Sequence, residues 1–188
     1  MLEPNLLGTK PISLYTYDSL LEMGYSVECI VSKTVDLSEC DITDYIQSRG
    51  ETSYWASHRY HNMDLFVCAM SLEEVVAHIS AMRVKTDEAM AFLEGKCAET
   101  EFTVVSEKDA KTTSHYVYIS AVVVKKSLRN STVALKLIRQ GYRLLNQYLK
   151  DTQQAEGIFA EAYSDEGRRL CELFGMNNIS ANFYRKDI

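Results

Sequence analysis

The run from Tyr116 to Val124 limits the folds open to this chain more than any other feature of the sequence. It is almost continuously apolar, as expected of a strand buried on both faces of a sheet. A polar turn at 125–131 follows, and apolar residues at helical spacing then predict a long amphipathic helix from about Thr132. A buried strand that leads directly into a long helix indicates a mixed α/β (α+β) fold.

The residues downstream continue the alternation. Gly157–Tyr163 predicts a strand, and Ser164 is placed to cap a helix whose first turn is acidic. That helix is expected to end at Gly175, and Ile179–Arg185 to close the fold as a strand.

Upstream of Tyr116, the periodicity, the capping residues and the glycines predict several shorter elements. These are a strand at Tyr25–Val31, a helix from Asp36 or Ser38 to about Ser48, an irregular stretch from Thr52 to Asn62, a hairpin of Leu65–Met70 and Val75–Val84, a short helix at Asp87–Leu93 and a strand at Ala98–Val105.

Length and composition favour one domain spanning residues 1–188, with residues 1–24 as an irregular extension that holds one helical turn around Asp18–Met23. Five cysteines, odd in number and without a Cys-x-x-Cys pair, support neither a disulfide framework nor a zinc ribbon. The sequence shows no signal peptide, and no run approaches the roughly 20 apolar residues that span a bilayer. We therefore expect a cytoplasmic protein.

The charges are distributed unevenly. The chain has 20 Lys and Arg against 26 Asp and Glu, yet residues 125–150 contain seven cations and no acidic residue. These cations surround the predicted start of a helix, where unpaired amides and the helix dipole favour an anion such as phosphate. The alternative is a helix with a solvated Lys/Arg face.

The segment from Tyr116 to Met176 resembles the GNAT superfamily of acyl-CoA-dependent N-acetyltransferases. The superfamily's signature is an apolar strand ending in a Gln/Arg-x-x-Gly-x-Gly/Ala loop that opens a helix, and Arg129–Ala134 occupies that loop after Val122–Val124. Ala160–Ser164 and Leu170–Met176 resemble the superfamily's second strand and helix. The resemblance covers residues 62–188 and is loose over 1–61.

The resemblance implies a mostly antiparallel central sheet with a splayed strand pair, and acetyl-CoA or another short acyl-CoA as cofactor. The pantetheine arm would lie along Val122, Val123 and Val124, and Ser164 would stand where an Asn often touches the cofactor. The backbone amides of the loop would hold the pyrophosphate; they belong to Arg129, Asn130, Ser131, Thr132, Val133 and Ala134.

The loop departs from the superfamily pattern because Thr132 replaces its first glycine. A β-branched residue at positive φ costs about 1–2 kcal/mol, so the loop must take an ordinary conformation or compensate for strain. Two outcomes stay open. Ser131 or Thr132 could donate a hydroxyl hydrogen bond to phosphate, or Asn130, Ser131 and Thr132 could cap the amides that phosphate needs.

The catalytic candidates also depart from the superfamily. Cys171 stands where a Tyr general acid is common, although a buried Cys is more often a core residue, and Ser120 stands where some members keep a Glu base. Glu99 and Glu101, expected on one strand face, or His115 are candidate bases, against the alternative that the two glutamates are solvated. Tyr116, Tyr118 and Tyr163 are further candidate acids, with packing as the alternative role.

Other candidate sites are weaker. His58 and His61 have metal-ligand spacing with Asp64 nearby, but nothing else completes a site, so no metal is expected. His78 is interpreted as a satisfied structural residue. The aromatic residues Tyr54, Trp55 and Tyr60 could line a pocket for a cationic amine, or belong to an ordinary core.

The leading hypothesis is an acyltransferase that moves an acetyl or short acyl group from coenzyme A to an amine-bearing acceptor, directly in a ternary complex. The alternative is a catalytically inactive GNAT-fold binding or regulatory protein, and a polyanion binder using the cations of 125–150 ranks lowest. We expect neither a membrane nor a nucleic acid as partner. The sequence fixes neither the acceptor nor the oligomeric state, a homodimer included.

Overall fold

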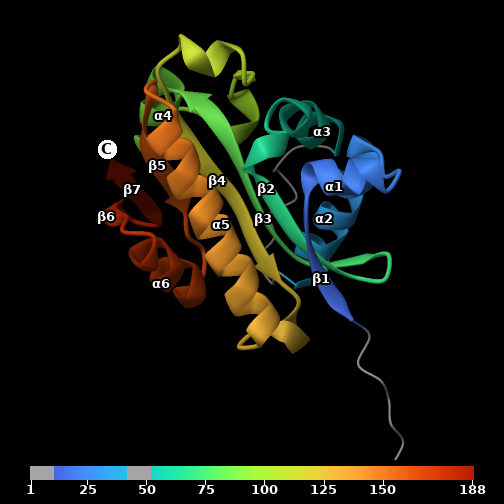
Figure 1. Ribbon diagram of the computed structural model, residues 1–188. Coiled ribbons are helices and arrows are strands. Elements are labelled where there is room, and N and C mark those ends of the chain that lie inside the picture. Colours follow the sequence, from blue (N-terminus) through green and yellow to red (C-terminus); the bar gives the residue numbers. More distant parts are fainter. Residues whose placement is uncertain (1–10, 42–51) are drawn as a thin grey trace, which may run out of the picture.

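A computed structural model describes residues 11–41 and 52–188 (Figure 1). Its described part contains a seven-stranded sheet in the order β1-β2-β3-β4-β5-β7-β6. Neighbouring strands are antiparallel except for the parallel pair β4–β5. The strands are β1 (Ile12–Thr16), β2 (Phe66–Ser71), β3 (Glu74–Lys85), β4 (His115–Val124), β5 (Ala155–Glu161), β6 (Asn177–Ser180) and β7 (Phe183–Asp187).

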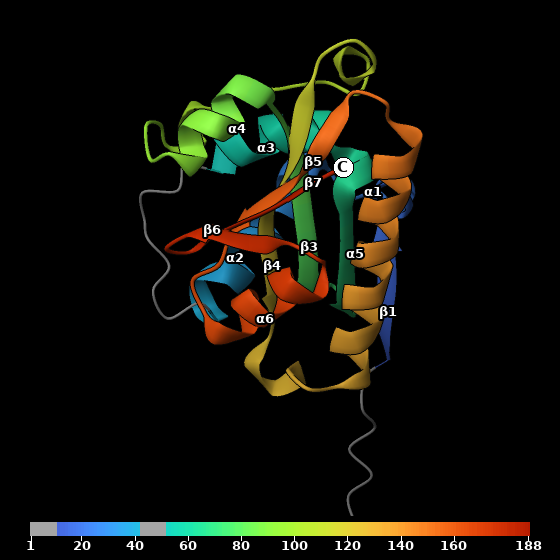
Figure 2. The ribbon, with the colours of Figure 1, turned by 90° about the vertical axis from the view of Figure 1, so that its left-hand side faces the viewer.

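Helices cover both faces of the sheet (Figures 1 and 2). They are α1 (Tyr17–Glu22), α2 (Val27–Asp41), α3 (Thr52–His61), α4 (Thr86–Leu93), α5 (Thr132–Asp151) and α6 (Asp165–Leu173). Side chains of α5 and α6 share a core cluster that includes Leu145, Cys171 and Phe174, whereas Leu20 and Ile30 of α1 and α2 pack on Phe66 at the opposite face. The mixed α/β, mostly antiparallel architecture is the one expected.

The helix α5 lies very close to the sheet. Leu137, Gly141 and Leu145 are buried along one side of it. A Cβ added at Gly141 would meet Ile79 Cδ1 of β3 at 2.4 Å, so this glycine permits the close approach. The packing holds the N-terminus of α5 at the end of β4.

Several predicted elements are confirmed. The hairpin is β2–β3, the short helix is α4, and the strand–helix–strand–helix order of β4, α5, β5 and α6 is present. Ser164 caps α6 by accepting from Gly167 N at 3.0 Å, and Gly175 closes it with φ of 77°.

The N-terminal predictions were wrong in several places. The predicted strand at Tyr25–Val31 does not form, and its residues from Val27 on begin helix α2, because Ile30, Val31, Thr34, Leu37 and Ser38 are buried at helical spacing. Asp36 and Ser38 therefore lie inside a helix instead of starting one, and its predicted end at Ser48 lies outside the described residues.

The stretch from Thr52 to His61, expected to be irregular, is helix α3. In the N-terminal extension the helical turn predicted around Asp18–Met23 is confirmed as α1 (Tyr17–Glu22), but Ile12–Thr16 is a strand paired with β2 and not irregular. Near the other end, Ile179–Arg185 is not one strand but parts of β6 and β7, which are joined by a turn with Ala181 at φ of 36°.

The predicted strand at Ala98–Val105 is replaced by a 3-10 turn, Glu99–Glu101, and an extended segment. The Glu101 carboxylate turns back to accept from Ala98 N at 2.6 Å, and Phe102 packs on Phe92 of α4. This local hydrogen bond competes with strand pairing, which explains the difference.

No helix in the described part of the chain combines the length and apolar character that a membrane crossing requires.

Candidate active site

The candidate active site lies where β4 and β5 separate. The two strands pair from His115 with Ala155 up to Ile119 with Ala160, and no further. From that level on, β4 pairs only with β3 among the described strands, and β5 turns away with β7 (Figure 2). The expected splayed strand pair is therefore present. A cavity of about 660 Å³ occupies the fork, with Ser120 to Val124 along one side.

One end of the fork is formed by the loop before α5. Asn130 has a left-handed φ of 66°, while Thr132 starts the helix with ordinary geometry, so the residue that replaces glycine carries no backbone strain. Asn tolerates this conformation better than most residues. The loop thus takes its positive φ two residues earlier than the glycine pattern suggests.

Of the two outcomes left open for this loop, capping of an amide by a side-chain oxygen is present at one position. Ser131 caps α5 and its hydroxyl accepts from Ala134 N at 3.3 Å. The amides of Ser131 and Arg129 bond to the carbonyls of Leu128 and Lys126. In the described structure, no hydrogen bond involves the backbone N–H of Asn130, Thr132 or Val133. One amide is capped by a hydroxyl, and three point to no acceptor.

The strand edge of Val122, Val123 and Val124 borders the same cavity. Arg129 reaches back over the strand end, donating from Nε to the Val124 carbonyl at 3.2 Å. Ser164 lines the cavity from β5's side, although its hydroxyl already caps α6. Seven of the predicted cofactor residues border this cavity, whereas Ser131, Thr132 and Val133 do not line it; the seven are Val122, Val123, Val124, Arg129, Asn130, Ala134 and Ser164.

Cys171 lines the cavity from α6 and is 6% exposed. Burial raises the pKa of its thiol to about 11, so the group is protonated at neutral pH. It also belongs to the core cluster with Phe174 and Met176. The Cys171 side chain thus packs in the core and also borders the cavity.

The two glutamates are separated from each other by the 3-10 turn. Glu99 is 8% exposed and lines the cavity, and its Oε2 accepts from the Tyr118 hydroxyl at 2.8 Å. Glu101 is exposed and caps its own turn. The structure therefore brings Glu99 to the site but not Glu101, because the strand that would have aligned them does not form.

Ser120 lies at the fork itself. Its hydroxyl donates to the Ser80 carbonyl at 3.2 Å, beside the bulge in β3 between Ser80 and Ala81. His115 is remote from the cavity lining and is neutral, since burial lowers its pKa; its Nδ1 lies 2.8 Å from the Thr113 carbonyl.

Sequence reasoning missed polar residues from α3 and β3. Arg59, His78 and Ser80 line the cavity together with Trp55. His78 was interpreted as a satisfied residue, and its Nδ1 does lie 3.0 Å from Ser80 Oγ, but no described group hydrogen-bonds its Nε2. The alternation of β3 was a usable signal for His78 and Ser80 on one face, but α3 was not recognised as a helix.

The metal motif does not assemble. His58 is buried against Tyr54, while His61 is exposed. Within residues 11–41 and 52–188, no three His, Cys, Asp or Glu side chains converge on a metal position.

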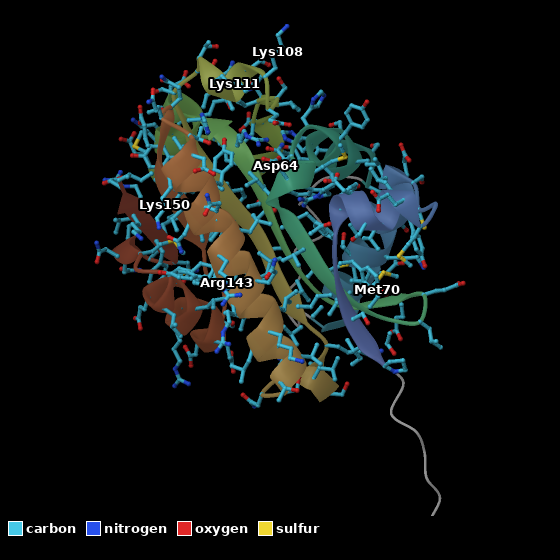
Figure 3. All side chains as sticks on the ribbon, in the orientation of Figure 1. Asp64, Met70, Lys108, Lys111, Arg143 and Lys150 are labelled. Atoms are coloured by element: carbon cyan, nitrogen blue, oxygen red, sulfur yellow. The ribbon has the colours of Figure 1, made fainter. Side chains whose placement is uncertain are left out.

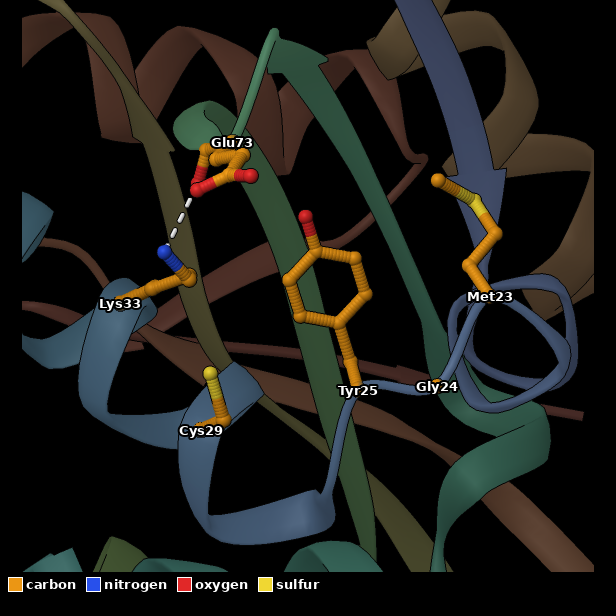
Figure 4. Close-up of a pocket in the computed structure, with 6 residues that line it drawn as sticks. All are labelled: Met23, Gly24, Tyr25, Cys29, Lys33 and Glu73. Atoms are coloured by element: carbon orange, nitrogen blue, oxygen red, sulfur yellow. Dashed lines mark hydrogen bonds between the residues drawn. The ribbon is translucent and has the colours of Figure 1, made fainter.

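A second hollow, of about 340 Å³, lies between the α1–α2 turn and the β2–β3 hairpin (Figure 4). Lys33 Nζ donates to the Glu73 carbonyl across it at 2.8 Å. Tyr25 and Cys29 line it as well, but the arrangement holds no converging catalytic groups, so we assign it no role.

No protein-family model matches the sequence, and no curated protein does. Solved structures match over almost the whole chain. NAA60 from Arabidopsis thaliana in complex with acetyl-CoA is 14% identical, with a TM-score of 0.57 over 95% of this chain and 100% of that one. The loading GNATL domain of CurA from Lyngbya majuscula is 10% identical, with a TM-score of 0.60 over 94% and 98%. Ard1 from Thermoplasma volcanium is 12% identical, with a TM-score of 0.55 over 94% and 97%.

Identity this low shows the fold and nothing finer. The chain has the GNAT fold, with the forked strand pair and the strand–loop–helix that its sequence predicted.

Proposed function

We propose that the protein is an acyltransferase that moves an acetyl or short acyl group from coenzyme A to an amine, directly in a ternary complex. The observation that carries the proposal is the junction of an open strand fork with a loop whose amides at Asn130, Thr132 and Val133 have no described acceptor. Solved structures that share the fold include NAA60 in complex with acetyl-CoA and the NatC complex bound to Gag peptide and CoA, which supports coenzyme A as the ligand.

The residues present fit an acyl-CoA. Backbone N–H groups at a helix N-terminus suit a diphosphate, and the edge of Val122–Val124 that borders the cavity suits an extended amide-bearing arm. A cavity of about 660 Å³ is within the range that holds small ligands. When bound, the cofactor supplies an activated acyl group as a thioester.

Glu99 is the proposed base. Its carboxylate faces the cavity from a buried position, and the Tyr118 hydroxyl orients it from β4, one residue before the fork. Transfer requires a neutral amine, so Glu99 would accept a proton from the acceptor's ammonium. Neither Ser120 nor the remote Glu101 can do this.

Cys171 is the proposed acid. Its thiol stays protonated because burial raises its pKa, and it reaches the cavity from α6. A neutral thiol in this position can supply a proton to the departing thiolate. Ser120 supports the fork through its bond to Ser80 rather than acting on protons.

The test has two parts. Calorimetry with desacetyl-CoA measures cofactor binding, and mass spectrometry after incubation with acetyl-CoA and a panel of primary amines measures transfer. Micromolar binding and N-acetylated product are expected. Absence of binding heat at millimolar cofactor contradicts the proposal.

The second candidate, an inactive GNAT-fold binding protein, is favoured by the capping of Ala134 N by Ser131 and by Ser120, which cannot act as a base at the position where the resemblance implies a Glu. It predicts cofactor binding without product for any amine in the panel.

A further inference from the structure

Two opposite charges line the cavity without pairing to each other. Arg59 comes from α3 and Glu99 from the turn after α4, and both border the fork. Among the described residues Arg59 forms no ion pair. Its Nη1 lies 3.4 Å from the Ala81 carbonyl oxygen, and its Cζ lies 5.0 Å from the centroid of the Phe66 ring.

The nearby acidic residue does not neutralise Arg59. Asp64 forms its ion pair with Arg83, a fully buried cation on β3. Asp64 acts on Arg59 through its charge and raises the pKa of the guanidinium, but the two side chains form no ion pair. Burial lowers the pKa of Arg59 to about 10, which still leaves it charged at neutral pH. Arg59 is half-buried, and a partly desolvated cation without an ion-pair partner is costly unless a ligand supplies the anion.

Arg59 lies at the level where the strands part. Its contact residue Ala81 pairs with Ile119, which is the last residue of β4 that pairs with β5. An anionic group held there would stand beside the place proposed for the acyl group.

A second side chain that can donate a hydrogen bond lines the same cavity. His78 is 3% exposed, lines the cavity, and packs on the Phe66 ring that also lies under Arg59, with ring centroids 6.3 Å apart. Burial holds its pKa at about 3, so the ring is neutral. When the Ser80 hydroxyl donates to Nδ1, Nε2 carries the hydrogen and is a donor. The nearby Thr34 carbonyl favours a hydrogen on the ring, but no hydrogen bond satisfies Nε2 in the described structure.

We propose that the cavity binds a zwitterionic acceptor, an amine that also carries a carboxylate, with the carboxylate on Arg59 and His78 and the ammonium toward Glu99. The identity of this ligand as an acyl acceptor rests on the proposed function; the anion subsite does not. Val31, Val35 and Trp55 form apolar walls of the same cavity and would contact the carbon chain between the two charges.

Trp55 makes the subsite measurable without any catalysis. It is the sole tryptophan of the chain and it lines the cavity, so its fluorescence reports ligand entry. The probes are glycine, β-alanine, 4-aminobutyrate, 6-aminohexanoate and phenylalanine, each compared with its own carboxamide. Titrations are run with and without desacetyl-CoA.

We expect at least one amino acid of the panel to give a saturable change, with its carboxamide binding about 10- to 100-fold more weakly, as for loss of a charge-assisted hydrogen bond. Arg59→Gln should abolish this preference for the carboxylate, and Arg59→Lys should retain part of it. Lys111→Gln is the matched control, because Lys111 is exposed on a distant turn (Figure 3).

Three results overturn the inference: no saturable signal with any carboxylate probe, equal binding of acid and carboxamide, or an unchanged preference in Arg59→Gln. Circular dichroism of each variant separates unfolding from loss of the subsite, and His78→Gln provides a second variant if Arg59→Gln does not fold. Failure of the proposed function has a different signature: a carboxylate preference persists, but desacetyl-CoA does not bind and no product forms.

Discussion

His115 Nε2 lies 2.8 Å from the Tyr148 hydroxyl, and this contact links α5 to the first residue of β4, on the side away from the fork. The same hydroxyl accepts from Arg83 Nε at 2.8 Å. Because His115 Nδ1 lies beside the Thr113 carbonyl, it carries the ring hydrogen, and Tyr148 donates to Nε2. The Tyr148 hydroxyl therefore hydrogen-bonds both the buried Arg83 and the buried His115. Asp64, labelled in Figure 3, extends this network through its ion pair with Arg83.

Replacing Tyr148 by Phe should lower the free energy of unfolding by about 1–3 kcal/mol, because it leaves Arg83 Nε and His115 Nε2 buried without this partner. Urea denaturation measures the loss. Tyr142→Phe on the same helix is the control, since Tyr142 is 41% exposed and should change stability little. Equal stability of the two variants would mean that the network contributes nothing.

Mild acid should destabilise the protein. Burial lowers the pKa of His58 from 6.5 to about 4 and that of His78 to about 3, and it also lowers the pKa of His115. The unfolded chain takes up these protons near pH 6.5 while the folded chain does not, so stability is fully present above pH 6.5 and falls as pH drops toward 4.

The size of this effect is on the order of 1 kcal/mol for each histidine, measurable by urea denaturation at a series of pH values. The variant His58→Gln should show a shallower decline, and His61→Gln, at an exposed position, should match the wild type. A stability that stays flat between pH 6.5 and 4.5 contradicts the assignment of neutral buried rings.

The loop amides can be tested one at a time. Thr132 is the first residue of α5, and Ser131 before it is extended, with φ of −92° and ψ of 164°. Both positions suit a proline at 132, which removes one N–H and leaves the helix intact. Thr132→Pro should weaken desacetyl-CoA binding about tenfold or more, while Thr132→Ala, which keeps the N–H, should bind within a fewfold of wild type. Calorimetry distinguishes the two, and equal affinities would show that this amide does not hold phosphate.

The strand and the helix that form the fork could be predicted because each is a long segment whose residue pattern is visible within that segment alone. Tyr116–Val124 and the helix after Thr132 each carry many residues of one period, and Ser164 and Gly175 mark the ends of α6. The start of α2 was mispredicted as a strand because seven residues, Tyr25–Val31, are too few to distinguish the strand period of two from the helix period of 3.6. The burial of Ile30, Thr34 and Leu37 on one side, seen only in the structure, identifies the helix.

The acceptor side of the site could not be predicted for a different reason. Arg59, His78 and Glu99 come from a helix, a strand and a 3-10 turn, and they meet only through the packing of α3 on the sheet. Glu101 looks equivalent to Glu99 in the sequence, yet a hydrogen bond to Ala98 N turns it away. No spacing rule contains that information.

Because Glu99 lines the cavity and Glu101 does not, mutating each of these two carboxylates tests the proposed base. Glu99→Gln keeps the size of a buried side chain that accepts from Tyr118 but removes its capacity to take a proton, so kcat for amine acetylation should fall about 100-fold or more with little change in affinity for desacetyl-CoA. Glu101→Gln should retain near wild-type kcat, since Glu101 is exposed and, among the described residues, hydrogen-bonds only within its own turn. Steady-state kinetics on one acceptor, with cofactor affinity from calorimetry, measures both. A Glu99→Gln enzyme with undiminished kcat would remove Glu99 from the mechanism, because the side chain would then act by position alone.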